Sequence, residues 1–231
     1  MRGKKVYERG SFYVAIVAVI LAFLGITFKD DILPRLQPFT SMVFEKKLSG
    51  FHIVEYDDDS VYSGEFKRGD KHGEGTYIWS DGNIYTGEWK KGKRAGKGIF
   101  RFISGDVYVG DFLNAKLHGQ GTMIYAYNAT YIGDWKDDVR DGKGTMTYED
   151  GRCYVGNWKN DMRSGKGTVY WPNGDSIEVN FSNNLANGEG KYTYENGRYR
   201  ISNWADNKEV GLIKYYHANG QFDYSERADE E

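Results

Sequence analysis

The sequence predicts an all-β repeat protein, an antiparallel meander of stacked 23-residue β-hairpins that follows one transmembrane α-helix. Three observations support this fold class. Aromatic residues and glycines recur every 23 residues without an insertion, two alternating runs fill each period, and a charge-free apolar segment precedes the array. A fixed period in this range is typical of repeat architectures, in which each repeat is one supersecondary unit.

Five columns of residues stay in phase through seven units. The first column is aromatic, a glycine follows it two positions later, and a second aromatic follows four positions later. Two further glycines, separated by one residue, complete each unit. The columns are Tyr62, Tyr85, Tyr108, Tyr131, Tyr154, Ile177 and Arg200; Gly64, Gly87, Gly110, Gly133, Gly156, Val179 and Ser202; Phe66, Trp89, Phe112, Trp135, Trp158, Phe181 and Trp204; Gly73, Gly96, Gly119, Gly142, Gly165, Gly188 and Gly211; and Gly75, Gly98, Gly121, Gly144, Gly167 and Gly190.

The first half of each unit predicts a β-strand. Tyr62, Gly64 and Phe66 are spaced by two, so in an extended strand they share one face. Residues 67–73 are rich in charge and glycine, and we expect them to form a connecting loop. Removing Cβ at Gly64 opens a slot over the backbone into which an aromatic ring can lie.

The second half predicts a second strand and a turn. In the run 75–79, Tyr77 and Trp79 lie on one face. Asp81 and Gly82 then supply the positive φ of a tight hairpin turn. Each repeat is therefore predicted to be a β-hairpin.

The ends of the array are atypical, as is usual for terminal repeats. Residues 51–56 have the pattern of the second half of a degenerate opening unit, and residues 222–224 predict a closing strand. The chain is thereby divided into a basic segment (1–11), the transmembrane helix (12–28), a linker (29–49), the repeat domain (50–225) and an acidic tail (226–231).

The repeat closely resembles that of the MORN (membrane occupation and recognition nexus) family. The pattern is an aromatic-x-glycine-x-tryptophan strand, a polar stretch and a G-x-G-T segment. It is carried by residues 85–89 and 96–98, 131–135 and 142–145, and 154–158 and 165–168. The resemblance implies an elongated, twisted sheet of hairpins that serves as a scaffold, membrane tether or dimerisation module, with phospholipid contact in some members.

Residues 12–28 predict a transmembrane helix. These 17 residues contain no charge, and as a helix they rise about 25 Å, which is at the short end for a hydrocarbon core of about 30 Å. A cleaved signal peptide is the alternative, but no small-x-small cleavage site follows before Lys29.

Charge predicts the orientation of this helix. Arg2, Lys4, Lys5 and Arg9 precede it, so the positive-inside rule places the N-terminus in the cytosol or the mitochondrial matrix and the repeats on the opposite side. The single cysteine, Cys153, forms no internal disulfide. These features favour the mitochondrial inner membrane over the endoplasmic reticulum or plasma membrane.

No catalytic, metal or cofactor site is expected. His72 and His118 share one repeat phase, which favours a structural role, and no His/Cys/Asp cluster has ligand spacing. Glycine runs such as 73–76 lack the Lys-Ser/Thr ending of a phosphate-binding loop. Acidic residues outnumber basic ones from Glu45 onward, which disfavours nucleic-acid binding.

One aromatic face is the candidate partner-binding surface, because a single-layer sheet cannot bury both faces and exposed aromatic patches mark interfaces. The alternative is that the sheet curls and covers this face itself. The face comprises Tyr77, Trp79, Phe100, Phe102, Tyr125, Tyr148 and Trp171.

A basic patch in the first two repeats is the candidate contact for anionic lipid head groups or an acidic partner. Ordinary solvated loop charge is the alternative. The patch comprises Lys67, Arg68, Lys71, Lys90, Lys91, Lys93, Arg94 and Lys97.

Two functions are compatible with these features. The first is a non-catalytic, membrane-anchored scaffold, an accessory subunit of a large membrane complex such as a mitochondrial respiratory or ATP synthase assembly. The second is a phospholipid-binding tether between membranes, as in the similar junctophilins, which carry their anchor at the opposite end.

Overall fold

The structure of the protein is a computed structural model that describes residues 5–7 and 48–228. The predicted transmembrane helix (12–28) and all but the last two residues of the predicted linker (29–49) lie outside the described residues. Within the described ranges, no helix has the length and hydropathy that a membrane crossing requires.

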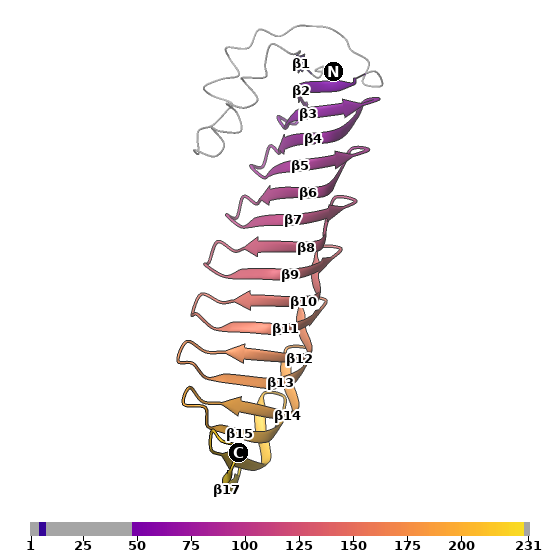
Figure 1. Cartoon of the computed structure of the whole chain (residues 1–231). Helices are drawn as coiled ribbons and strands as arrows, with labels where there is room; N and C mark the ends of the chain where they lie inside the picture. The colour runs from indigo at the N-terminus through magenta and orange to yellow at the C-terminus, as the bar shows by residue number, and fades with distance from the viewer. Residues whose placement is uncertain (1–4, 8–47, 229–231) are drawn as a thin grey trace. The chain divides into compact units, whose positions relative to one another are not determined.

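The chain divides at Lys116 into two units, and both are all-β (Figure 1). Unit 1 contains β1 (Lys5–Tyr7), β2 (Gly50–Glu55), β3 (Val61–Lys67), β4 (Asp70–Ile78), β5 (Ile84–Lys90), β6 (Lys93–Arg101) and β7 (Val107–Leu113). Unit 2 contains β8 (Lys116–Ile124), which starts at the boundary, β9 (Thr130–Lys136), β10 (Val139–Thr147), β11 (Cys153–Lys159), β12 (Met162–Tyr170), β13 (Ser176–Ser182), β14 (Leu185–Thr193), β15 (Tyr199–Ala205), β16 (Lys208–Tyr216) and β17 (Phe222–Arg227).

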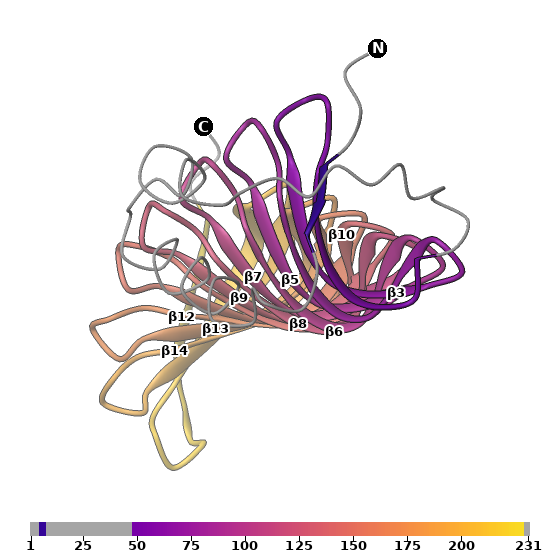
Figure 2. The same ribbon diagram turned by 90° about the horizontal axis from the view of Figure 1, so that it is seen from above.

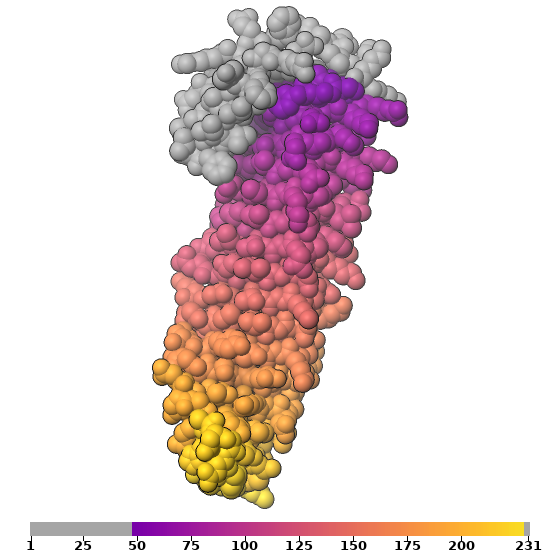
Figure 3. All heavy atoms as spheres, viewed as in Figure 1, coloured from indigo at the N-terminus to yellow at the C-terminus, as the bar shows by residue number. Residues whose placement is uncertain are grey.

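Each unit is an antiparallel meander, because each strand pairs with the next strand in the chain. Figure 2 shows that the strands curve along their length. In the space-filling view, the colours of residues 139–193 follow chain order along the visible face (Figure 3). The predicted hairpin repeat is confirmed.

The predicted loop at residues 67–73 is wrong. Only Arg68 and Gly69 connect β3 to β4, with φ of 55° and 88°, which is the backbone geometry of a two-residue type I′ hairpin turn. The polar residues that follow belong to β4. The register between β3 and β4 shifts at a β-bulge, and Gly73, with φ of 56°, lies in that bulge.

The second turn has the predicted geometry. Gly82 has φ of 96°, and its N–H donates to the Trp79 carbonyl at 3.0 Å. The Trp79 N–H donates in turn to the Asn83 carbonyl at 3.0 Å. The turn therefore closes the hairpin as the Asp-Gly pair predicts.

The ends of the array contain strands, as predicted. β2 pairs with β3 as a half-repeat, and β17 closes unit 2 and runs to Arg227, two residues beyond the predicted end of the repeat domain. β1 was not predicted: Lys5–Tyr7, inside the basic segment, pairs with Ile53–Glu55 of β2.

In the repeats that begin at Tyr62, Tyr85, Tyr131 and Tyr154, the core is a tyrosine ring that lies on two glycines, which confirms the steric prediction. A Cβ added at Gly64 would lie 2.6 Å from the Tyr62 hydroxyl and 2.5 Å from Cα of Gly75, the residue opposite. The five tyrosines of this column are completely buried. They are Tyr62, Tyr85, Tyr108, Tyr131 and Tyr154.

Each buried tyrosine is held by contacts of its hydroxyl and its ring. Its hydroxyl donates to the carbonyl of the residue three positions later, at 2.8–3.0 Å. Its ring meets the aromatic residue of its own repeat edge to face, as with Tyr62 and Phe66 at 5.0 Å between centroids. The rings of Tyr62, Tyr85, Tyr131 and Tyr154 also meet the aromatic residue of the next repeat, as with Tyr62 and Trp89 at 5.3 Å. We call the face that carries these tyrosines the inner face, and the opposite face the outer face.

We predict that Gly144→Ala destabilises the protein by about 1–3 kcal/mol, because the added methyl overpacks a filled site. A Cβ at Gly144 would lie 2.5 Å from Cζ of Tyr131. The measurement is the shift of the urea unfolding midpoint. The matched control is Gly92→Asn. Gly92 is a turn residue with φ of 76° and open space for a Cβ, and Asn184, which has the same position in a later repeat, adopts a similar φ of 72°. Equal losses in the two variants would contradict the tyrosine–glycine contact as the cause.

Candidate interaction face

An unbroken row of five aromatic rings lies on the inner face of unit 1. Successive ring centroids are 5.8 Å apart from Tyr56 to Tyr77, 4.5 Å from Tyr77 to Trp79, 5.3 Å from Trp79 to Phe100 and 4.4 Å from Phe100 to Phe102. Phe100 is buried and the other four are half-buried. We call these five residues the aromatic row.

In unit 2 the corresponding row is interrupted by aliphatic side chains. Buried Met123, Met146 and Val169 occupy the repeat phase of Tyr77 and Phe100. The half-buried aromatic residues that continue the two columns of the row on the inner face of unit 2 are Tyr125, Tyr148, Trp171, Tyr192, Tyr194 and Tyr215.

All seven predicted partner-binding residues therefore lie on the inner face, four in unit 1 and three in unit 2. Tyr56, Tyr192 and Tyr194 were not predicted. Tyr56 and Tyr194 lie one period beyond Trp79 and Trp171. Tyr192 lies four periods beyond Phe100, so following that column past Met123, Met146 and Val169 would have found it.

In four repeats, one cation lies over aromatic rings of the inner face. The Lys71 amine is 4.4 Å from the Tyr77 centroid, and the Arg94 guanidinium is 4.7 Å from that of Phe100. Arg140 and Arg163 repeat the arrangement in unit 2, over Trp158 and Phe181 respectively. Cation–π contacts of this kind contribute about 0.5–2 kcal/mol each, with the larger values where water is excluded.

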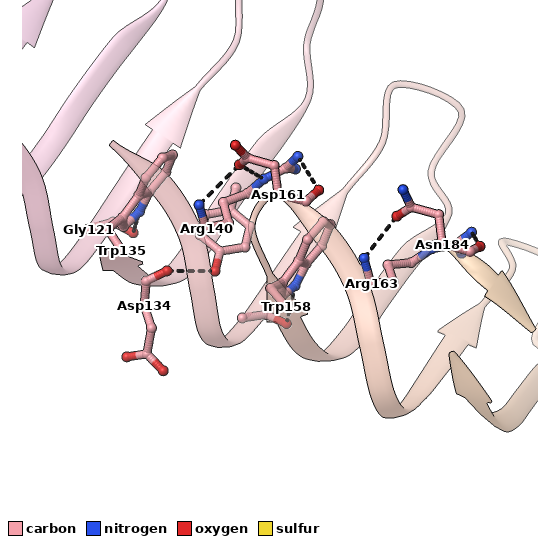
Figure 4. Close-up of polar contacts among 10 residues, drawn as sticks. Gly121, Asp134, Trp135, Arg140, Trp158, Asp161, Arg163 and Asn184 are labelled. Carbon is pink, nitrogen blue, oxygen red and sulfur yellow. Dashed lines mark hydrogen bonds and ion pairs between the residues drawn. The ribbon is translucent and has the colours of Figure 1, made fainter. Parts of the chain in front are cut away.

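We call the repeat position of Lys71, Arg94, Arg140 and Arg163 the cation column. In unit 2, Arg140 and Arg163 also join their repeats to the following ones (Figure 4). The Arg140 backbone N–H donates to Asp161 Oδ1 at 3.0 Å, and its Nε and Nη2 donate to Asp161 Oδ1 at 2.9 Å and to the Asp161 carbonyl at 3.0 Å. One repeat later, the Arg163 N–H donates to Asn184 Oδ1 at 2.8 Å. The turn residue of each repeat is thus tied to the strand of the preceding one.

The last repeat exchanges the chemistry of two columns. Arg200 stands in the tyrosine column and Glu209 in the cation column, and Arg200 Nε lies 2.9 Å from Glu209 Oε1. The guanidinium lies 4.1 Å from the Tyr192 centroid. The exchange keeps a cation against the aromatic rings where the tyrosine is missing.

Burial keeps the column tyrosines protonated. Loss of solvent raises the pKa of Tyr154 to about 12. For Tyr192, burial and then its hydrogen bond to Asp175 raise the pKa to about 12. Both hydroxyls are neutral donors at physiological pH. The part of the chain that the structure describes holds no cluster of His, Cys, Asp or Glu arranged for a metal ion.

The structure separates the predicted basic patch into three groups. Lys71 and Arg94 are half-buried over the rings of the inner face, and Lys97 lies on the outer face 2.6 Å from Asp111. The other five are exposed at one edge of unit 1, beside the β3–β4 and β5–β6 turns. We call these five the basic edge: Lys67, Arg68, Lys90, Lys91 and Lys93.

The outer face has a different composition, with β-branched residues along its centre. Thr76 and Thr86 face each other across β4 and β5, with their hydroxyls 3.1 Å apart. In unit 2, Ile132 is 55% exposed and Val155 is 43% exposed. Near the end of unit 2 the outer face also carries three aromatic rings in contact, with centroids 4.8 Å apart from Tyr199 to Tyr216 and 5.8 Å from Tyr216 to Phe222.

Comparison with known proteins agrees with the repeat. The MORN repeat family model matches six segments that together cover more than half of the chain: residues 62–84, 85–107, 108–126, 131–151, 154–176 and 180–197. Comparison with curated proteins found no match.

Two solved structures are similar at low identity. The TCP domain of SAS-4 from Drosophila melanogaster, in complex with a proline-rich motif of Ana2, is 15% identical with a TM-score of 0.47, over 86% of this chain and 100% of that chain. The wild-type TCP10 domain of CPAP from Danio rerio is 12% identical with a TM-score of 0.41, over 79% of this chain and 94% of that chain. Both TM-scores lie below 0.5, so neither likeness carries a conclusion about function.

We predict that Asp161→Ala destabilises unit 2 by about 1–3 kcal/mol, because it removes the carboxylate that accepts from the backbone N–H and Nε of half-buried Arg140. Asp161→Asn is the matched control, since Asn184 and Asn207 accept the same backbone bond in the following repeats. Thermal unfolding followed by circular dichroism measures both variants. An Asn variant as unstable as the Ala variant would show that the charge, and not the acceptor, couples the repeats.

Proposed function

We propose that this chain, which belongs to the MORN repeat family, is a non-catalytic, membrane-anchored scaffold that holds other subunits of a large membrane protein complex. The observation that supports this function is the aromatic row on the inner face. Aromatic side chains are enriched in protein interfaces and depleted from ordinary surfaces. A single-layer sheet has no second layer of its own to cover them, so a partner subunit is the expected cover.

The anchor in this proposal is the apolar segment 12–28, and the proposed location is the mitochondrial inner membrane. The basic residues before the segment and the lack of any possible internal disulfide support that location. The repeats would then lie in the intermembrane space.

This topology competes with one feature of the fold. Lys5–Tyr7 pairs with β2, so these residues and the repeats lie on one side while the pair is formed. A three-residue edge strand gains about 1 kcal/mol per hydrogen bond. The eleven Leu, Ile, Val and Phe residues of segment 12–28 contribute about 0.3–0.6 kcal/mol each on insertion, roughly 3–7 kcal/mol together. Insertion therefore outweighs the strand pair, and β1 is expected to leave β2 when the segment crosses the bilayer.

The basic edge supports a second candidate, a phospholipid-binding tether. Each cation near an anionic membrane surface contributes about 1 kcal/mol, and the edge exposes five cations beside two adjacent turns. In this case anionic lipid, and not a protein subunit, would be the main contact of the array.

We predict that a photo-crosslinking amino acid at Trp171 or Trp79 captures the same partner subunit in intact membranes, while the same amino acid at Ile132 on the outer face does not. Mass spectrometry of the adducts and migration of the complex in mild detergent are the measurements. Equal capture from both faces would contradict an inner-face interface. A protein that migrates alone and binds anionic vesicles through the basic edge would establish the tether instead.

We predict that residue 3 and residue 136 lie on opposite sides of the membrane. Gly3→Cys and Lys136→Cys, each in a Cys153→Ser background, are labelled with a membrane-impermeant maleimide in sealed vesicles before and after permeabilisation. Single-pass anchoring predicts that only one of the two sites is labelled before permeabilisation. Labelling of both sites from the same side would overturn this orientation and would indicate that the β1–β2 pair is retained.

A further inference from the structure

β2 bonds to β3 on one side only, and its other side is an edge to which a further strand can add. The Tyr56 N–H donates to the Ser60 carbonyl at 2.9 Å, so the even-numbered residues of β2 bond to β3. Backbone groups alternate in direction along an antiparallel strand. The N–H and C=O groups that point to the free edge of β2 are therefore those of Phe51, Ile53 and Glu55.

β1 occupies this edge (Figure 1). Lys5 pairs with Glu55, and Tyr7 pairs with Ile53. Ile53 and Val54 are only 5% and 3% exposed, although they belong to the first strand of the array in a single-layer sheet. Departure of β1 therefore opens an apolar edge.

β17, the last strand of unit 2, is an edge strand that carries its own protection. Its pairing with β16 shifts at a β-bulge, and three of its six residues are charged: Asp223, Glu226 and Arg227. Bulges and charges are common protection against pairing with another chain. β2 instead pairs with β3 in one continuous register and has a single Asp, Glu, Lys or Arg residue, Glu55. β2 therefore depends on a covering strand, whereas β17 does not.

The proposed membrane topology takes that cover away, because β1 leaves β2 when segment 12–28 crosses the bilayer. A regular and apolar edge left uncovered is a template for pairing with another chain. Strand addition to such an edge combines main-chain hydrogen bonds, which give affinity, with side-chain contacts that give specificity. In a scaffold, a strand of a partner subunit is the expected replacement for β1.

The side chains of the edge define the residues of that strand. Glu55 Oε2 is buried and has no hydrogen-bond partner within residues 48–228, so a basic side chain opposite Glu55 supplies a donor and an opposite charge. Val54 lies on the inner face, and Ile53 packs against Phe51 and Val61 on the outer face. The next two residues of the added strand are therefore apolar, one on each face.

We propose that the free edge of β2 binds an extended segment of a partner subunit by antiparallel strand addition, with a basic residue opposite Glu55 followed by two apolar residues opposite Val54 and Ile53. The added strand takes the register of β1, which is an internal occupant that gives way on membrane insertion. This inference rests on the proposed scaffold function and adds a contact at the sheet edge to the one on the inner face.

The test uses the full-length protein in phosphatidylcholine nanodiscs and a fluorescent peptide, Gly-Lys-Lys-Val-Tyr-Glu-Arg-Gly, which has the sequence of residues 3–10. Fluorescence anisotropy is expected to show binding, at least tenfold weaker when the second lysine of the peptide is replaced by glutamate. Glu55→Lys is expected to reverse this preference. A peptide with proline in place of tyrosine lacks the N–H that bonds to Ile53 and is expected to bind at least tenfold more weakly. Equal binding of the three peptides to the wild-type protein would overturn the strand site.

Disulfide capture locates the added strand. In a Cys153→Ser background, a peptide with cysteine in place of its second lysine is expected to capture Glu55→Cys, because the register of β1 puts these positions opposite each other. The matched control is Ser225→Cys, at an exposed residue of the β17 edge strand, which is expected to stay free. Equal capture at the two positions would overturn the assignment to β2.

Tyr7→Pro separates the site from its exposure, because it removes a β1–β2 hydrogen bond and frees the edge without membrane insertion. Peptide binding to Tyr7→Pro but not to the wild-type protein in nanodiscs would show that β1 keeps its place and would overturn the exchange. Peptide binding to neither protein would overturn the strand site, while partner capture from Trp79 would leave the scaffold standing. Loss of both would overturn both.

Discussion

A tyrosine ring on two facing glycines is the contact from which the rest of each repeat follows. A single-layer sheet has no opposing layer, so its hydrophobic burial must come from side chains that lie flat on their own strands. At Gly64 and Gly75 the backbone is bare, and the Tyr62 ring occupies the space that two Cβ atoms would need. The ring is completely buried although no second layer covers it. Large aromatic side chains bury about 150–250 Å² each, which is why the repeat places its aromatic residues at this position.

The same constraint explains the repeats that depart from the consensus. Ile177 replaces the column tyrosine, and Val179 then fills the space that a glycine would leave, with 3% exposure. Over Gly190 the Trp204 indole takes the vacant place, since a Cβ there would lie 2.8 Å from Trp204 Nε1. That indole nitrogen is buried without a hydrogen-bond partner among the described residues. Where the tyrosine is absent, glycine and aromatic residues change together, because the slot must be either filled or removed.

The period of the sequence was enough to predict the hairpins, the turns at Gly82 and its equivalents, and the partial repeats at both ends. It failed at residues 67–73, because charge and glycine are typical of loops and the β-bulge at Gly73 has no separate signal in composition. It placed the aromatic residues on one face correctly, because alternation in a strand determines the face. The period could not divide the cations. Lys71 lies opposite Phe66 on the inner face and Lys67 lies on the outer face only because the turn between them has two residues. Correcting the loop to a strand is what separates these two lysines.

The inner faces of the two units differ. The buried column changes little from repeat to repeat, so the variable part of the inner face is the second strand of each hairpin. Tyr77 and Phe100 continue the row in unit 1, whereas Met123, Met146 and Val169 interrupt it in unit 2. Methionine adapts its shape to different partners, while aromatic rings present a rigid surface. The inner face of unit 1 therefore presents an unbroken row of rigid rings. In unit 2 the aromatic residues of the inner face are separated by Met123, Met146 and Val169, of which the two methionines have flexible side chains.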